Sequence, residues 1–213
     1  MMEKLKNFIL ILFLVLFPVL ITLGFLMRLN QARLISISPD WFYSMMTLHG
    51  LGLVGLVYVT SFVIMVYLAG RYVKIRTGVM TFSIILTILG VILLVINFLF
   101  GRFAPGWYFL YPIIFYPQWK IWATDVFLVA LALLGVAWFV WSIAYLWSVI
   151  ERYGVSKALG WHYLKGEIKE EVPPIIIIST VSTIAGTVSL ISGVLLLAHF
   201  LYHRFSGNPV DAL

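Results

Sequence analysis

The chain has 213 residues, of which 63% are hydrophobic and only 10% are charged. A soluble domain carries about 25% charged residues, so this chain has too little polar surface for water alone, and lipid must solvate much of it. The absence of cysteine excludes disulfides, thiolate zinc sites and cysteine-ligated iron–sulfur clusters from this chain. The net charge of +6 does not indicate nucleic-acid binding, because the basic residues lie in short segments between apolar runs.

Five apolar runs are each long enough to cross a bilayer core, which takes about 20 helical residues. The first follows two lysines, but it is too long for a signal-peptide core and has no small-residue cleavage site after it, so we expect a retained span. Pro18 should kink it, and Pro173 and Pro174 should start the last span. The sequence predicts one all-α, polytopic membrane domain over residues 1–213, with spans at about 8–27, 43–70, 79–100, 123–150 and 175–202.

The distribution of basic residues predicts the orientation of this bundle. If the N-terminus is cytoplasmic, nine Lys and Arg residues fall in inside segments and five in outside segments, which together make the 14 in the chain. The positive-inside rule favours this orientation. We therefore expect a multi-pass protein of a prokaryotic plasma membrane, with a cytoplasmic N-terminus and Leu213 outside.

Three glycines in the second run match a dinucleotide-binding pattern. Gly50, Gly52 and Gly55 fit G-x-G-x-x-G, but that pattern binds a nucleotide only between a strand and a helix of a βαβ unit. Inside a membrane span, the glycines instead predict the close approach of a neighbouring helix or of a flat cofactor.

His49 is the main candidate for a functional residue, because a histidine within a span is rare. It lies eight residues after the interfacial Trp41, which is ~12 Å at 1.5 Å per residue. Helical spacing places Met45, Met46, Gly52, Leu53 and Leu56 on its face. An apolar face with a small residue one turn away suits a heme edge. A hydrogen bond from His49 to a neighbouring helix is the alternative.

Three stretches resemble subunit I of the heme–copper oxygen reductases. Thr47-Leu48-His49-Gly50 is similar to the T-x-H-G motif of the second span in that family. Residues 107–112 (Trp-Tyr-Phe-Leu-Tyr-Pro) resemble its outer loop between spans three and four, and residues 208–213 (Asn-Pro-Val-Asp-Ala-Leu) resemble the stretch before its sixth span. The resemblance covers nearly the whole chain, from the first span to its end.

The resemblance implies that His49 is an axial ligand of the iron of a low-spin heme, of a or b type. The chain would then be part of a respiratory terminal oxidase, which passes electrons from cytochrome c, a copper protein or quinol to oxygen and translocates protons. Copper and the high-spin heme are expected in the remaining half of subunit I or in a partner chain. A copper-bearing subunit II and the lipid membrane complete the expected partners, with no nucleic acid. No catalytic residue is expected in this chain.

The family pattern is incomplete in this sequence. The sixth, seventh and tenth spans, which hold the copper ligands and the other heme ligands in the family, have no counterpart before Leu213. A split subunit, a fragment of a longer one and a relative without the oxygen-reducing half all remain open. Residues 71–78 also lack the aspartate that opens a proton channel in A-type members, which favours a B-type or another divergent member.

Other polar residues are expected to be structural. His199 and His203 have the i, i+4 spacing of a metal pair, but interfacial rings are the favoured interpretation. His162 is expected in a solvated segment, residues 151–172, and Asp125 at a helix N-terminus, where the macrodipole favours a carboxylate over a role in proton exit. A stripe of small residues in the last span predicts close helix packing rather than a proton wire: Ser179, Ser182, Gly186, Ser189 and Gly193.

Two other functions remain possible for such a chain. A b-type membrane cytochrome that only carries electrons would need a second ligand within the chain, for which His199 is the other candidate in a span. A heme-free scaffold or transporter would show no Soret band. Transporters usually place charged residues near the midplane, where this sequence has almost none.

Overall fold

The computed structural model describes residues 2–103, 105, 119–166 and 171–206, and among them the regular secondary structure is helical. Five helices are long and apolar enough to cross a membrane, which confirms the predicted all-α bundle. The elements are α1 (Met2–Gln31), α2 (Pro39–Ala69), α3 (Thr77–Ile96), the π-helical η1 (Asn97–Gly101), α4 (Ile121–Ala158), the short α5 (Trp161–Leu164) and α6 (Pro174–Ser206).

The helices form where the apolar runs are, and each predicted span lies within one of the five membrane-length helical segments except for Gly70, which follows the last residue of α2; the third span covers both α3 and η1. α1 continues through Pro18, beside which the Thr22 hydroxyl donates to the Pro18 carbonyl at 2.8 Å. α6 begins at Pro174, as predicted for proline at a helix start. Large apolar side chains stay exposed along these helices, for example Leu14, Phe82 and Ile178. In lipid this exposure has no hydrophobic cost, because the acyl chains are as apolar as the side chains.

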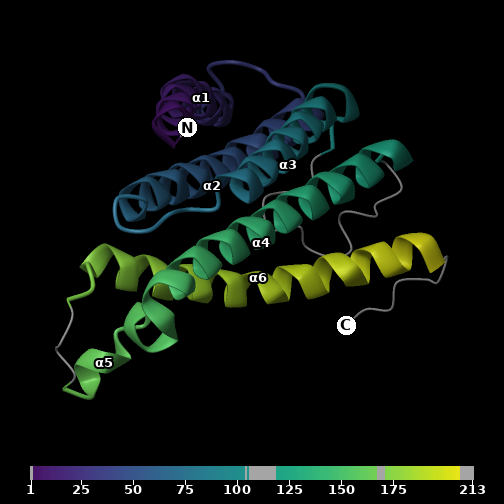
Figure 1. The fold of residues 1–213 in the computed structure, drawn as a ribbon. Helices are drawn as coiled ribbons and strands as arrows, with labels where there is room; N and C mark the ends of the chain where they lie inside the picture. Colours follow the sequence, from purple (N-terminus) through teal and green to yellow (C-terminus); the bar gives the residue numbers. More distant parts are fainter. Residues whose placement is uncertain (1, 104, 106–118, 167–170, 207–213) are drawn as a thin grey trace.

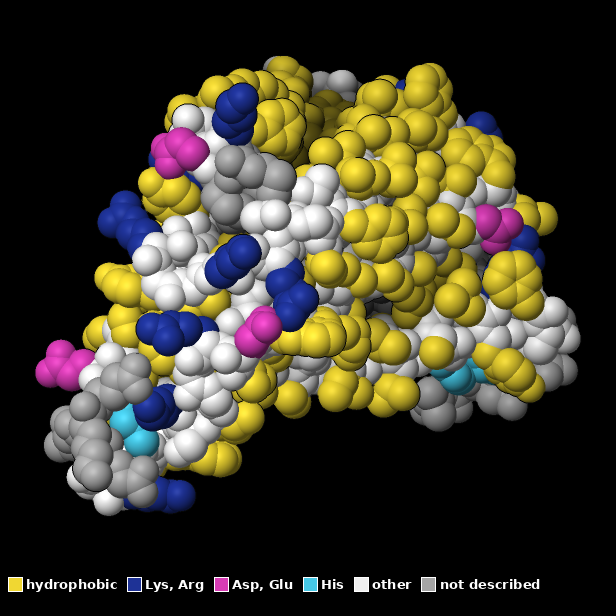
Figure 2. All heavy atoms as spheres, in the orientation of Figure 1, with side chains coloured by type: hydrophobic (Ala, Val, Ile, Leu, Met, Phe, Trp, Pro, Cys, Tyr) yellow, Lys and Arg dark blue, Asp and Glu magenta, His cyan; other side chains and the backbone are white. Residues whose placement is uncertain are grey.

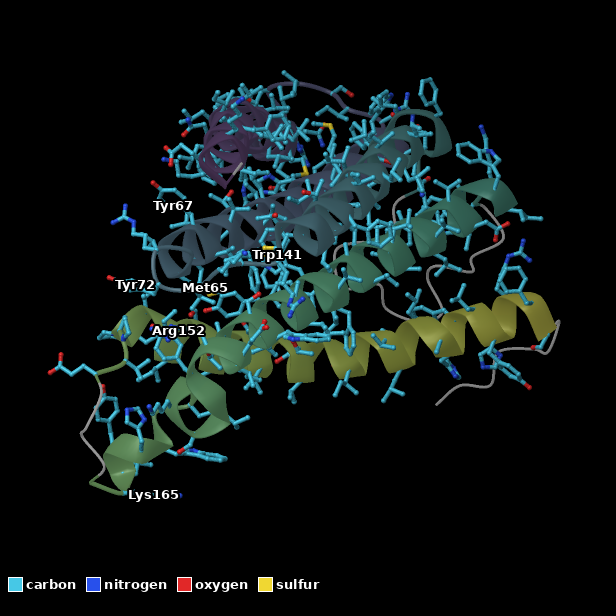
Figure 3. All side chains as sticks on the ribbon, viewed as in Figure 1. Met65, Tyr67, Tyr72, Trp141, Arg152 and Lys165 are labelled. Carbon is cyan, nitrogen blue, oxygen red and sulfur yellow. The ribbon has the colours of Figure 1, made fainter. Side chains whose placement is uncertain are left out.

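The helices pack in two groups that meet along α2 (Figure 1). α1 packs on α2, α3 packs on α4, and α4 packs on α6, with a smaller contact between α2 and α6. The Phe62 ring of α2 lies 4.0 Å from the ring of Trp138 and 5.7 Å from that of Trp141, both on α4. Figure 3 shows Met65 and Trp141 in the space between α2 and α4. Large aromatic side chains therefore fill a junction where the helix backbones stay apart.

Polar side chains are buried at the seam between α4 and α6. Tyr145 and Ser179 are fully buried and hydrogen-bond to each other through their hydroxyl groups. Thr180 and Thr183, also buried, donate to backbone carbonyls one turn earlier in α6. These side-chain bonds satisfy hydroxyl groups that lipid cannot.

Residues 151–166, the described start of the segment 151–172, contain more helix than the sequence predicts. α4 runs past residue 150 to Ala158, with one break at Gly154, whose φ of 72° lies in the left-handed region that favours glycine. α5 follows, and its His162 is only 2% exposed. The expectation of a loop is wrong for residues 151–158 and 161–164, because the helix continues beyond the membrane-length run and a second short helix follows the break, although many of these side chains stay exposed.

Charge gathers at one end of the bundle. Figure 2 shows several Lys and Arg side chains over the end that holds α5, while hydrophobic side chains cover much of the rest of this face. Arg152 and Lys165 both lie at that end in Figure 3. Arg76 also joins this group, since its guanidinium donates to the Glu151 carboxylate at 2.8 Å. This asymmetry is the structural counterpart of the nine-to-five division of basic residues counted along the sequence.

Candidate functional site

His49 lies on α2 at the face that packs against α1. Its Nδ1 is 2.7 Å from the backbone carbonyl oxygen of Leu20. A carbonyl oxygen can only accept a hydrogen bond, so Nδ1 must carry the hydrogen. In a neutral imidazole the lone pair is then on Nε2. The contact therefore fixes the tautomer and leaves Nε2 as the nitrogen that can ligate a metal.

Two glycines let α1 and α2 approach closely around this histidine. A Cβ at position 24 would lie 2.7 Å from Cε1 and 3.1 Å from Nε2 of His49, so the ring occupies the place of a side chain on α1. In return, a Cβ at position 52 would lie 2.6 Å from Cδ2 of Leu20. His49 and Leu20 thus each fill the space left by a glycine on the facing helix.

The neighbours predicted for His49 divide between two surfaces. Met45 and Leu56 are buried, and Gly52 contacts Leu20, as expected for a packed face. Leu53 instead lines a groove of about 680 Å³ between α2, α4 and α6. Most of the groove residues from α2 lie far around the helix from His49 by helical spacing. Tyr58, Trp138 and Gly186 line the same groove, whose walls are largely apolar.

The other histidines are held in different surroundings. His199 and His203 lie near the end of α6, with ring centroids 4.2 Å apart in an edge-to-face arrangement. His162 is buried, and neither ring nitrogen has a hydrogen-bond partner among the described residues. Its ring lies 3.9 Å from that of Tyr163. The expectation of a solvated His162 is wrong, because α5 turns this residue inward.

Asp125 is part of an ion pair that the sequence did not indicate. The residue lies more than a turn inside α4, which starts at Ile121, so a first-turn macrodipole contact does not explain it. Its carboxylate accepts two hydrogen bonds from Arg204 of α6, at 2.6 Å from Nε and 3.0 Å from Nη2. This bidentate pair joins the start of α4 to the end of α6.

The small-residue stripe on α6 packs only in part within this chain. Ser179 is buried against Tyr145, and a Cβ at Gly186 would lie 3.1 Å from Cζ2 of Trp138. A Cβ at Gly193 would meet no atom within 4 Å, and Ser189 is exposed. Within the stripe, Ser179 and Gly186 thus contact α4, whereas Ser182 and Ser189 are exposed and Gly193 has open space beside it.

Parts of the predicted family pattern lie outside the described residues. These are the stretches 107–112 and 208–213. Among the residues that the structure describes, no group of three or more His, Asp or Glu side chains could hold a metal ion. The site therefore consists of His49 with the groups on α1 that orient it.

Sequence reasoning found His49 but not its partners on α1. Leu20 contributes only a backbone carbonyl, which no residue type reveals, and Gly24 lies in an otherwise continuous apolar run. A signal was nevertheless present, because Gly24 is the one glycine in the predicted span 8–27. A lone small residue in such a span is typical of a helix contact.

Comparisons of the chain with protein-family models, with curated proteins and with solved structures found no match.

Proposed function

We propose that this chain is the heme-binding part of a respiratory terminal oxidase, in which His49 is an axial ligand of the low-spin heme that relays electrons toward oxygen. The observation that carries the proposal is the hydrogen bond from Nδ1 of His49 to the Leu20 carbonyl at 2.7 Å. A metal-ligating histidine usually donates its other ring N–H to a carbonyl or carboxylate, which fixes the ring and makes the ligating nitrogen more basic.

The depth of His49 along its helix suits such a cofactor, whereas the packing of α1 on its ring limits the space for one. The ring is partly buried about 12 Å along the helix from Trp41, within the hydrocarbon layer. The ring lies against Gly24 of α1, where an added Cβ would be 3.1 Å from Nε2, so a heme iron at this nitrogen would require α1 to move aside. The bound heme would supply one-electron redox chemistry, while this chain would hold and orient it and keep it in an apolar environment.

The remaining parts of the oxidase would come from outside this chain. The T-x-H-G resemblance of residues 47–50 supports the choice of family. Copper and the high-spin heme would belong to the other half of subunit I or to partner subunits. The electron donor would be cytochrome c, a copper protein or quinol.

An electron-carrying b-type cytochrome is the competing proposal, and it needs a second ligand from this chain. His199 is the histidine available for that role, on α6, whereas His49 packs against α1. Figure 1 shows α1 and α6 at opposite edges of the bundle. This separation favours a second axial ligand from outside the chain, and thereby the oxidase.

The test is a reduced-minus-oxidised spectrum of the complex purified from membranes. His49→Ala should abolish the low-spin heme band and electron transfer to oxygen, because an iron that loses one of its two strong ligands is no longer low-spin. The high-spin heme should survive if the complex assembles. His199→Ala and His203→Ala serve as matched controls and should leave both hemes in place. Loss of the low-spin band in His199→Ala as well as in His49→Ala would reject the oxidase in favour of the electron carrier, persistence of the band in His49→Ala would reject His49 as a ligand, and a parent chain without a Soret band would favour the heme-free scaffold.

A further inference from the structure

We propose that His199 and His203 form a two-histidine binding site for a divalent transition-metal ion, such as Zn²⁺, at the C-terminal end of α6. This site is separate from the one proposed for heme, and it does not depend on it. The two residues are spaced i, i+4, which places both imidazoles on one helix face. Neutral imidazole is a good ligand for Zn²⁺, Cu²⁺ and Ni²⁺.

The rings are already close enough for chelation. Their centroids are 4.2 Å apart, with planes at 74° to each other. A Zn²⁺ ion binds imidazole nitrogen at about 2.0–2.1 Å, so two nitrogens can share one ion after small side-chain rotations about a fixed helix. The remaining coordination positions would be filled by water or by a ligand from outside the chain.

One ring nitrogen of this pair is buried without a partner. Nδ1 of His203 is shielded from solvent and makes no hydrogen bond to the described residues. Buried polar atoms almost always have a partner, so an orphaned nitrogen calls for a further group at this position. A metal ion bound to Nδ1 of His203 and to one nitrogen of His199 would provide one, after a small separation of the two rings.

The electrostatic setting favours a cation. His203 lies in the last turn of α6, where the macrodipole is negative. The adjacent Arg204 would repel a metal ion, but its charge is compensated by the bidentate pair with Asp125. The same pair fixes the end of α6 to α4, which holds the backbone under the two histidines in place.

The test measures Zn²⁺ binding by titration calorimetry, with the full chain purified without a histidine tag and treated with a chelator. We expect one ion per chain in the parent. His199→Gln and His203→Gln should each weaken binding by about tenfold or more, because a single imidazole loses the gain from the second, linked ligand.

A relocated pair is the matched control. In the double variant His203→Gln with Phe205→His, the number of histidines is unchanged, but the two rings lie about 120° apart around the helix. Phe205 is 78% exposed, so the change should not disturb folding. This variant should bind as weakly as the single variants. The two-histidine site is wrong if the double variant, or either single variant, binds Zn²⁺ within about threefold of the parent affinity. It is also wrong if the folded parent binds no Zn²⁺.

Discussion

The α1–α2 and α4–α6 seams both contain glycines, but they differ in how closely the facing helix packs on them. In the α1–α2 seam a side chain of the facing helix lies against both Gly24 and Gly52, whereas on α6 this is true of Gly186 but not of Gly193. The space beside Gly24 is filled by the His49 ring, and the space beside Gly52 is filled by the Leu20 side chain. On α6, Gly186 is approached by Trp138, whereas Gly193 has open space around it. Without a hydrophobic force between helices in lipid, such close packing is what holds spans together.

The two seams also treat polar groups differently. The α1–α2 seam contains one histidine bonded to a backbone carbonyl. The α4–α6 seam contains the buried Tyr145–Ser179 pair and is closed at its end by the Asp125–Arg204 ion pair. The first seam thus holds a single imidazole in one orientation, whereas the second fixes two helices and leaves one face of α6 open.

The largest effect is expected from a side chain at position 24. Gly24→Val would place a Cβ 2.7 Å from the His49 ring and displace it from the Leu20 carbonyl. We expect a loss of about 3 kcal/mol in the free energy of unfolding, from overpacking and the broken hydrogen bond. Equilibrium unfolding in mixed detergent micelles measures it. Gly55→Val is the control, because a Cβ there meets no atom within 4 Å. Equal losses in the two variants would show that the seam is not interlocked.

A smaller effect is expected at the α4–α6 seam. Gly186→Leu would push against the Trp138 ring, 3.1 Å from the new Cβ, and should cost about 1–2 kcal/mol and impair assembly. Gly193→Leu should leave the isolated chain unchanged. Size-exclusion profiles and unfolding curves of both variants provide the measurement. If Gly193→Leu prevents only assembly with other subunits, the open half of the stripe packs on a partner, whereas normal assembly of Gly186→Leu would contradict close packing there.

The ion pair at the end of α6 should contribute less. The side chains of Arg204 and Asp125 are 30% and 38% exposed, so water and headgroups screen their attraction, and about 1 kcal/mol is expected from the pair. A double-mutant cycle with Asp125→Asn and Arg204→Gln isolates this coupling. A coupling energy near zero would mean that packing of Phe200 and its neighbours, rather than charge, holds this end of the seam.

The orientation of the bundle can be tested without perturbing stability. The excess of basic residues predicts a cytoplasmic N-terminus and an external C-terminus. Alkaline phosphatase fused to the C-terminus should be active, and a green fluorescent protein fusion at the same place should be dark. The reverse result would put the Asp125–Arg204 end of the second seam in the cytoplasm.

The sequence predicted the five spans because length and hydropathy determine which segments can cross a bilayer. It placed His49 on the second of these helices, and its depth of about 12 Å from Trp41 stays a prediction that depends only on counting residues along a helix. It did not predict that α1 covers His49, because helical periodicity identifies a face but not the helix that packs on it. The continuation of α4 and the burial of His162 were missed, since a mixed polar segment gives no periodic signal before a break such as that at Gly154. The Asp125–Arg204 pair joins residues 79 positions apart, a separation that one sequence does not reveal.

The acceptor for His49 is a main-chain oxygen, and this has a genetic consequence. A substitution at Leu20 changes the side chain but keeps the carbonyl, so most variants at that position should retain the orientation of the imidazole. A saturation screen would therefore rank position 20 as tolerant of other apolar residues. The same screen should find positions 24 and 52 intolerant, since any Cβ there meets a side chain closer than 3.0 Å. A genetic screen would therefore detect the hydrogen bond between His49 and Leu20 mainly as intolerance to substitution at Gly24 and Gly52, and not at Leu20 itself.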